Sequence, residues 1–425
     1  MNLRWPEGTM RVLILSQYYS PEPVEKVHDL ACGLASHGHD VQVLTGFPCY
    51  PLGKIYAGFR QRLVSREMLD GIEVIRVPQL PDHSRSIVRR MLYYVSFAMT
   101  AMGIGLFAVR RPDVVVVYQA ALPVGIAGWW ISRLRRSSLV LDVVDLWPES
   151  VTASGLLQRP WAVSLIRRIA CLVYSAATHV NVVTKGFRQN LIAMGVPERK
   201  LSVIENWMPT STYSLVQPDH EFAQALKLQN KFVVLYAGNM GASQDLHNVL
   251  DAAKRLLDHP DICFLLIGGG TQQAELIARV QREGLHNVLL PGRYPPDKMP
   301  GLYALASVLL VHLKPDSLSD VSIPSKTFAY MASGRPVLMA ARGDGAEFIK
   351  ENQFGITAEP ANPANLADAV LKLRQMTVAV RERFGANGRE AFERRYCSKV
   401  QIERFSAMLE QTVGSNHREQ RKRAA

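Results

Sequence analysis

Short runs of aliphatic residues recur along this chain, and each ends at a loop that leads into a helical pattern. This alternation of strand and helix is typical of parallel sheets joined by right-handed helical crossovers. No other feature constrains the fold as strongly, and it predicts an α/β protein built from doubly wound, Rossmann-like sheets. The predicted strands are residues 12–15, 41–45, 72–77, 114–118, 138–142, 180–184 and 201–206, then 232–237, 264–267, 288–290, 307–312 and 337–339.

The strands form two groups, separated by a linker-like stretch at 207–220 (WMPTSTYSLVQPDH). A chain of 425 residues with 48% hydrophobic and 20% charged residues is large enough for two cores. We therefore expect a disordered extension over 1–9, a first domain over 10–210 and a second over 211–398. A C-terminal helix with a basic tail, 399–425, is expected to cross back to the first domain.

The formal net charge of +12 favours an anionic partner, although a basic surface that only aids solubility explains it equally well. Nucleic acid is disfavoured because no module combines clustered basic and aromatic residues. The five cysteines are scattered and never have CxxC spacing, which predicts a reducing compartment and no zinc site.

Glycine-rich or basic loops follow four consecutive strands of the second half. Gly238-Asn-Met-Gly241 follows the first strand, Gly268-Gly-Gly270 the second, and Arg293 the third. The fourth strand leads to Ser322, Ser325 and Lys326 at the start of a predicted helix over 326–332. Backbone N–H groups, hydroxyls and a lysine at such edges suit a phosphate. The alternative is an ordinary capped helix with Lys326 in solvent, which the four converging loops disfavour.

The motif Asp142-Val-Val-Asp-Leu-Trp-Pro-Glu-Ser150 follows a strand of the first half. Charged residues just past the carboxyl end of a parallel strand are often functional. Asp145 is therefore a candidate for contact with substrate or for catalysis. The alternative is that Asp145 and Glu149 only stabilise the start of the next helix.

Residues 91–109 carry no charge and are bracketed by Arg89-Arg90 and Arg110-Arg111. The segment is nearly long enough to span a bilayer, but the strands before and after it must join one sheet. We therefore expect a membrane-interface helix over 87–111 that lies against anionic lipid. A fully buried core helix is the alternative. Other arginines would extend the basic surface if they lie on the same side: Arg85, Arg133, Arg135 and Arg136.

Several common chemical motifs are missing from the sequence. No strict GxGxxG follows the first strand of either half, and no Walker, HExxH, GxSxG or DxD motif is present. We therefore expect no cofactor and no metal requirement.

The motifs together resemble a known family. SQYYSPEP, DLWPES, YAGNMGASQDL, PGRYPPDKMPGLYALASVLLV and IPSKTFAYMASGRPVL occur in the order and spacing of the family-four retaining glycosyltransferases of the GT-B fold. They are most similar to the WbuB and colanic-acid WcaI-like branch, and the resemblance covers roughly residues 10–396. It implies two Rossmann-like domains that face each other across a cleft.

The resemblance also implies an activity. A metal-independent hexosyl or N-acetylhexosaminyl transferase would use a nucleotide-sugar, with a UDP-sugar favoured and a GDP-sugar possible. The acceptor would be a glycolipid on undecaprenyl diphosphate, used for exopolysaccharide, O-antigen or capsule. The enzyme would act at the cytoplasmic face of the inner membrane, as a peripheral or monotopic protein.

Site residues follow from the matched motifs. Asp145, Lys326 and Glu347 are expected to be catalytic, although Glu347 could instead be a helix N-terminal acid. The remaining candidates fall on the donor and acceptor sides. Donor binding is assigned to Gly238, Asn239, Gly241, Gln244, Gly268, Gly269, Arg293, Ser322, Ser325 and Lys326, and the acceptor side to Tyr18, Glu22, Trp147 and Glu149.

Three departures from the family pattern keep other functions open. Ala329 and Val321 stand where the family has paired glutamates, and Asn239 and Gln244 replace an arginine and a lysine. Residues 24–26 (Val-Glu-Lys) replace glycines. A nucleotide-sugar epimerase, or an inactive scaffold of a polysaccharide assembly complex, is therefore the alternative.

Overall fold

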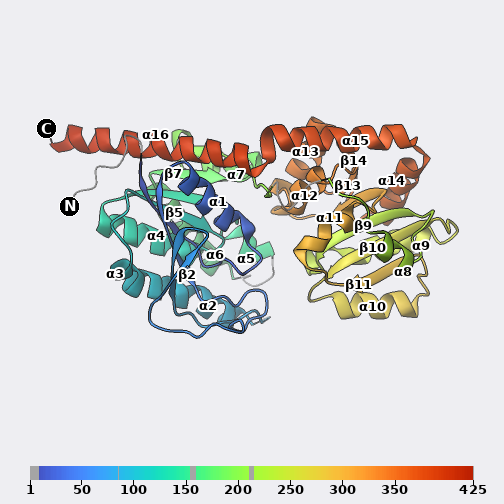
Figure 1. The fold of residues 1–425 in the computed structure, drawn as a ribbon, viewed down its shortest axis with the longest axis horizontal. Helices are drawn as coiled ribbons and strands as arrows, with labels where there is room; N and C mark the ends of the chain where they lie inside the picture. The colour runs from blue at the N-terminus through green and yellow to red at the C-terminus, as the bar shows by residue number, and fades with distance from the viewer. Residues whose placement is uncertain (1–8, 85, 154–158, 210–214, 425) are drawn as a thin grey trace. The chain divides into compact units, whose positions relative to one another are not determined.

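The computed structural model describes residues 9–84, 86–153, 159–209 and 215–424. The chain divides into two compact units (Figure 1). Unit 1 contains Met1–Glu205 and Ser398–Ala425, and unit 2 contains Asn206–Cys397. Nearly all of the expected extension over 1–9, and also Arg85, lie outside the described residues.

Unit 1 is built on one eight-stranded sheet in the order β3-β4-β2-β1-β5-β6-β7-β8. All neighbours pair in parallel except β3 and β4, which are antiparallel. The two halves of the order run outward from β1 and β5, as in a doubly wound sheet. The strands are β1 Arg11–Leu15, β2 Asp40–Gly46, β3 Ser65–Leu69, β4 Ile72–Val77, β5 Val114–Gln119, β6 Ser138–Val143, β7 His179–Val182 and β8 Leu201–Val203.

Helices connect these strands. The first helix, α1, ends at Ser36, and Gly38 follows in the left-handed region (φ +88°), where glycine is the usual helix stop. The helices of unit 1 are α1 Glu25–Ser36, α2 Ile87–Thr100, α3 Leu106–Ala108, α4 Leu122–Arg135, α5 Glu149–Ala153, α6 Pro160–Ala176, α7 Lys185–Ala193 and α16 Ser398–Ala424, with a 3₁₀ turn at Glu198–Lys200.

The apolar segment after β4 is helical, as predicted, but it is not one regular helix. A π-helical turn at Ala101–Gly105 separates α2 from α3. Because β4 and β5 belong to the same sheet, the segment returns to the sheet that it left, which confirms the reason for rejecting a transmembrane span. Val88–Ala108 is long and apolar enough to cross a membrane. Only 28% of its most apolar window is buried inside the protein.

Unit 2 contains a six-stranded parallel sheet in the order β11-β10-β9-β12-β13-β14. The order reverses at β9 and β12, so their carboxyl ends form a topological switch point, where doubly wound sheets bind ligands. The sequence did not predict β14. The strands are β9 Phe232–Asn239, β10 Ile262–Gly269, β11 Val288–Gly292, β12 Val308–His312, β13 Val337–Ala340 and β14 Gly355–Ala358.

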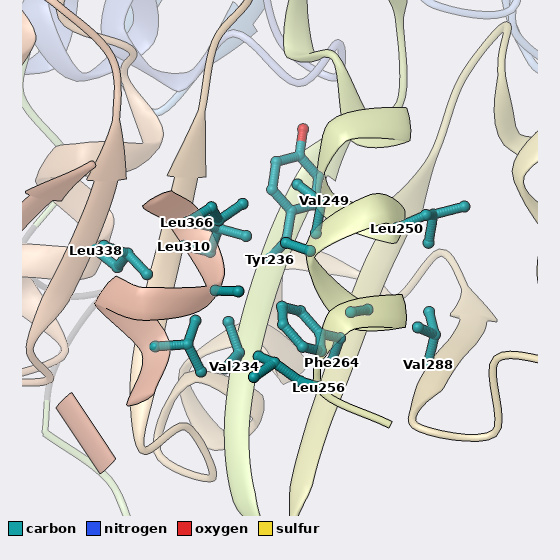
Figure 2. Close-up of a cluster of buried hydrophobic side chains, with 14 of the residues drawn as sticks. Val234, Tyr236, Val249, Leu250, Leu256, Phe264, Val288, Leu310, Leu338 and Leu366 are labelled. Carbon is teal, nitrogen blue, oxygen red and sulfur yellow. The ribbon is translucent and has the colours of Figure 1, made fainter. Parts of the chain in front are cut away.

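The core of unit 2 is a cluster of buried aliphatic and aromatic side chains on the strands and on helices α9 and α14 (Figure 2). Tyr236 on β9, Phe264 on β10 and Leu310 on β12 are fully buried there. The helices are α8 His220–Ala225, α9 Leu246–Arg255, α10 Gln273–Arg282, α11 Met299–Tyr303, α12 Lys326–Ala332, α13 Gly343–Asn352, α14 Pro363–Gln375 and α15 Val378–Ala391. Shorter turns are Ala242–Gln244, Pro296–Lys298, Ser319–Val321 and the π-helical Phe392–Tyr396.

The C-terminal helix α16 completes unit 1 by packing on α1 and β6. The sequence predicted a C-terminal helix followed by a basic tail within 399–425, whereas the structure is helical from Ser398 to Ala424. Its inner face contributes Ile402, Phe405 and Leu409 to the core. A methyl group built on Gly33 of α1 would come within 2.6 Å of the Ile402 side chain, so the two helices pack closely.

Candidate active site

Two glycines on neighbouring strands form the floor of the candidate site. Gly238 of β9 pairs with Gly268 of β10, and Asn239 pairs with Gly269. Both Gly238 (φ +138°) and Gly268 (φ +137°) adopt backbone angles that other residues rarely take. A methyl group on Gly268 would lie 1.9 Å from the carbonyl oxygen of Gly238. The backbone at this edge is therefore kept bare of side chains.

Lys326, the first residue of α12, places its ammonium group against this floor. Its Nζ lies 3.8 Å from the centroid of the Tyr236 ring and would be 2.8 Å from a methyl group on Gly238. Among the described residues no carboxylate pairs with it. Burial lowers the pKa of Lys326 to about 7. A partly buried ammonium group that lacks a negative partner strongly favours the binding of an anion.

A second cation lies over the adjacent register position. Arg293, just after β11, is exposed, and its Nε would be 2.5 Å from a methyl group on Gly269. Because Gly238 and Gly269 are successive positions across two paired strands, Lys326 and Arg293 flank one patch of backbone. The structure thus brings together five of the predicted donor-side residues. They are Gly238, Gly268, Gly269, Arg293 and Lys326.

The loop after β9 is ordered by its own side chains. The Oε1 of Gln244 accepts hydrogen bonds from the Gly241 N–H (3.2 Å) and from the Asn239 side chain (3.4 Å). The Gly241 amide, which we predicted to face a phosphate, therefore has an internal partner. Its role in donor binding stays a prediction.

His312, at the end of β12, is a residue that the sequence reasoning missed. It is 1% exposed, and its Nδ1 lies 2.8 Å from the carbonyl oxygen of Gln244. Its Nε2 lies 2.8 Å from the side-chain nitrogen of Asn248. A carbonyl only accepts, so Nδ1 carries the proton, and burial lowers the pKa of this imidazole. A histidine that ends a predicted strand at the switch point was the available signal.

The segment before Lys326 is held to the start of α13. The Ser322 hydroxyl donates to the carbonyl of Leu318 at 2.5 Å, whereas Ser325 is exposed and its side chain does not cap α12. A methyl group on Gly343 would lie 1.8 Å from the carbonyl oxygen of Asp320, so the two loops touch. Glu347 is exposed and lies on α13, which begins at Gly343. Its contact with a donor stays a prediction.

Ala329 occupies the position where the family pattern has a glutamate. It is 2% exposed, inside a helix whose residues from Thr327 to Ala332 are all buried. The Thr327 hydroxyl is also buried and has no hydrogen-bond partner within the described part of the chain. No carboxylate is therefore offered at this position.

In unit 1, Asp145 lies in the loop after β6. Burial raises the pKa of Asp145 to about 7, although the positive charge of Arg90 acts in the opposite direction. Near neutral pH this carboxyl can therefore both accept and donate a proton. Arg90 comes from α2, and its Nη2 lies 3.4 Å from the hydroxyl of Tyr94. From the sequence, Arg90 was expected only to flank the apolar segment.

Aromatic side chains from α2 and from the loops after β1, β2 and β6 pack against one another in unit 1. The ring of Tyr94 lies 6.2 Å from that of Trp147, and the ring of Tyr18 lies 5.1 Å from that of Tyr50. The indole N–H of Trp147 is buried and has no hydrogen-bond partner among the described residues. Burial, followed by the neighbouring Tyr94, raises the pKa of Tyr18 well above its usual value.

Two predicted acceptor-side acids have structural partners. The Glu22 carboxylate accepts backbone hydrogen bonds from Tyr19 (3.0 Å), Cys49 (2.7 Å) and Tyr50 (2.7 Å), which fixes the loops after β1 and β2. Glu149 forms an ion pair with Arg167 at 2.9 Å. Substrate contact by either acid remains a prediction that these bonds do not favour.

Residues 24–26, which form the start of α1, are also tied to the interior. Lys26 is 8% exposed, and its Nζ lies 2.9 Å from the carboxylate of Asp142 on β6. Asp142 also accepts a hydrogen bond from Asn181 at 2.8 Å. The lysine that replaces a family glycine therefore neutralises a buried carboxylate of the sheet.

Over the described ranges, no group of three or more His, Cys, Asp or Glu side chains is arranged to hold a metal ion.

Unit 2 thus joins a bare backbone floor at a topological switch point to two cations, which is the chemistry of a phosphate-binding α/β domain. Residues 23–207 match the glycosyl transferase 4-like domain, and residues 231–376 match the glycosyl transferases group 1 domain. The chain therefore belongs to the family-four glycosyltransferases of the GT-B fold.

Two curated relatives illustrate this family. The chain is 27% identical over 348 residues to WcaI of Escherichia coli K12, named for colanic acid biosynthesis, covering 78% of this chain and 83% of WcaI. It is 27% identical over 280 residues to the glycosyltransferase WbjE of Pseudomonas aeruginosa, covering 64% of this chain and 67% of WbjE.

Solved structures share the fold. HepE of Anabaena in complex with UDP-glucose matches with a TM-score of 0.70 at 17% identity, covering 95% of this chain and 100% of HepE. Sucrose-phosphate synthase of Thermosynechococcus elongatus matches with a TM-score of 0.71 at 16% identity, covering 95% of this chain and 100% of the synthase. The predicted fold class, two doubly wound parallel α/β domains of the GT-B kind, is confirmed.

Proposed function

We propose that this glycosyltransferase moves a hexosyl or N-acetylhexosaminyl residue from a nucleotide-sugar, preferably a UDP-sugar, to a lipid-linked acceptor with retention of configuration. The product would enter a bacterial surface polysaccharide. WcaI, named for colanic acid biosynthesis, supports the polysaccharide assignment. HepE, solved with UDP and with UDP-glucose, supports the choice of nucleotide.

The observation that carries the proposal is the ammonium group of Lys326, which lies on the glycine floor of unit 2 and has no carboxylate partner among the described residues. A nucleoside diphosphate leaves with growing negative charge, and fixed positive groups in a partly water-excluded site stabilise that charge. Lys326 faces Gly238 and Arg293 faces Gly269, so both cations can meet one diphosphate. Diphosphate binding then keeps the Lys326 ammonium group protonated.

On the acceptor side, we propose that Asp145 in unit 1 binds the hydroxyl group of the acceptor that receives the sugar. Its carboxyl titrates near pH 7, so the carboxylate can accept the hydroxyl proton at neutral pH. The positive charge of Arg90, which hydrogen-bonds to Tyr94 on α2, acts on the same carboxyl group. A lipid-linked acceptor is consistent with this, because the opposite face of α2 is apolar and exposed.

The decisive experiment is thermal stabilisation of the purified protein by UDP, GDP, ADP, dTDP and CMP. A ligand that binds only the folded state raises the melting temperature as its concentration exceeds the dissociation constant. We expect a response to UDP that Lys326→Ala abolishes and that a matched surface variant, Lys350→Ala, leaves intact. If the folded protein responds to none of the nucleotides, the transferase proposal fails and an inactive scaffold takes its place.

A further inference from the structure

We propose that the outer face of helices α2, α4 and α6 is a docking surface for an anionic phospholipid bilayer. This extends the proposed membrane location from the single segment 87–111 to three helices. It rests on the proposed function only in supposing that the acceptor is a lipid. The surface itself is defined without reference to the donor site.

The exposed side chains of α2 form one apolar stripe. Val88, Leu92, Val95 and Met99 are 68%, 50%, 42% and 59% exposed, and their spacing places them on one side of the helix. The other side faces the protein, where Tyr93 and Phe97 are buried. Phe107 of α3 is 84% exposed and adds an aromatic ring.

Helices α4 and α6 repeat this pattern. On α4, Trp129, Trp130 and Leu134 are exposed, although the helix is packed so tightly on β5 that a methyl group on Gly128 would lie 2.2 Å from Val117. The outer side of α6 presents Trp161, Leu165 and Leu172, which are 66%, 49% and 70% exposed.

The three helices are neighbours, since α4 contacts both α2 and α6. Their exposed apolar stripes therefore lie on adjacent helices, and together they contain three tryptophans. Monomeric soluble proteins rarely leave such a large apolar area in water. Tryptophan is the residue most typical of the membrane–water interface, because its ring is apolar and its N–H is polar.

The charges on this surface select the partner. Neither the segment from α2 to α3 nor α4 nor α6 contains an aspartate or glutamate, whereas α2, α4 and α6 each contain two arginines. One arginine of each pair has a partner within the protein: Arg90 binds Tyr94, Arg135 the carbonyl of Leu106, and Arg167 the carboxylate of Glu149.

The other arginine of each pair points into solvent. Arg89, Arg133 and Arg168 are exposed and have no acidic partner among the described residues. An interface with a protein partner or a second copy would place these three cations against a surface that must supply matching acids. Anionic lipid headgroups supply negative charge everywhere, and juxtamembrane arginines each strengthen binding to them. A bilayer therefore satisfies the apolar and the charged side chains together.

The test is flotation of the full chain with vesicles of phosphatidylcholine, alone or mixed with phosphatidylglycerol. We expect binding that is stronger with phosphatidylglycerol and weakened by salt. Trp130→Ser with Leu165→Ser should reduce binding about tenfold or more, because two apolar side chains no longer enter the lipid. The matched control, Val378→Ser with Val380→Ser, alters exposed valines of unit 2 and should bind as the wild type.

A second variant tests the charges. Arg89→Gln, Arg133→Gln and Arg168→Gln together should lower binding to phosphatidylglycerol vesicles roughly a hundredfold, and binding to phosphatidylcholine much less. Wild-type binding by the Trp130 and Leu165 variant would overturn the proposal. So would a soluble oligomer that this variant dissociates, because the face would then be a protein interface.

The outcome is separable from that of the proposed function. Lys326→Ala should still bind vesicles, and the Trp130 and Leu165 variant should still be stabilised by UDP. Loss of UDP binding with intact vesicle binding would reject the transferase alone. If the wild type fails to bind vesicles but is still stabilised by UDP, the docking surface alone is rejected.

Discussion

At the scale of single residues, Lys326 combines an expected functional role with a cost in stability. Its ammonium group rests on the Tyr236 ring and is paired with no carboxylate of the described chain. In the folded protein its pKa is about 7, compared with 10.5 for an ordinary lysine. The unfolded chain therefore holds this proton more tightly than the folded one, and the charged form opposes folding.

Lys326→Met should raise the stability of the ligand-free protein by about 1 to 3 kcal/mol at neutral pH, because an apolar side chain replaces the charge. The gain is fully present below pH 7 and disappears as the pH rises from about 7 towards 10.5, where the folded and unfolded lysine are both neutral. Turnover should fall by orders of magnitude. Denaturant unfolding at several pH values, beside a sugar-transfer assay, measures both effects. A destabilised variant would contradict this account of Lys326.

Asp145 and Lys326 should together give a bell-shaped pH profile with a maximum near pH 7. Above pH 7 the free protein loses the Lys326 charge and binds a diphosphate less well. Below pH 7, Asp145 is protonated and no longer accepts a proton from a hydroxyl. The profile of kcat/KM reports the free enzyme, so both limbs should appear there. Asp145→Asn should remove the acid limb and Lys326→Arg the alkaline limb; limbs that persist in these variants would exclude the assignments.

At the scale of elements, the donor site depends on two strands that approach without side chains. The carbonyl of Gly238 fills the space where a side chain on Gly268 would stand. His312 stabilises the same edge from β12, since it binds the carbonyl of Gln244. The loop geometry is therefore set by backbone packing between β9, β10 and β12.

Gly268→Ala should destabilise unit 2 by about 2 to 4 kcal/mol, because it adds both a clash at 1.9 Å and an unfavourable φ of +137°. The matched control is Gly284→Ala, where φ is +64° but nothing lies within 4 Å. That change should cost only about 1 kcal/mol. Chemical denaturation of both variants gives the comparison. Equal losses would mean that the close approach of the strands is not what requires glycine at 268.

At the scale of the whole molecule, the two units differ in how the chain builds them. Unit 2 is one continuous segment, whereas unit 1 needs α16, which returns from the far end of the sequence. Phe405 of α16 is 0% exposed, and Ile402 packs against Gly33. The last helix is thus part of the core of the first domain.

Phe405→Ala should destabilise unit 1 by about 3 to 5 kcal/mol, the usual loss when a buried phenylalanine leaves a cavity. Glu403→Ala, on the exposed side of the same helix, is the control and should have little effect. Because Phe405 lies outside unit 2, UDP should still bind the variant with wild-type affinity. Calorimetric unfolding with and without UDP measures both quantities, and loss of UDP binding in Phe405→Ala would refute the independence of the donor site.

Much of the architecture is encoded locally and could be predicted. The aliphatic runs at 12–15 and 232–237 and the glycine stop at 38 specify strands and helix ends through short-range sterics. The start of α12 at Lys326 followed from the same kind of signal. Less regular elements were missed, including β3 at an exposed sheet edge and the short β14, because neither has a continuous aliphatic run.

The sequence by itself therefore determined the alternating α/β fold, the family and the residues that gather at the strand ends. Only the tertiary structure decided which of those residues stay available to a ligand. Within the described part of the chain it left Lys326 without a carboxylate partner, bound Glu22 to three backbone amides and placed Asp145 beside Arg90. It also placed the exposed stripes of α2, α4 and α6 on adjacent helices. Burial, partner and charge depend on residues distant in the chain, so no local pattern contains them.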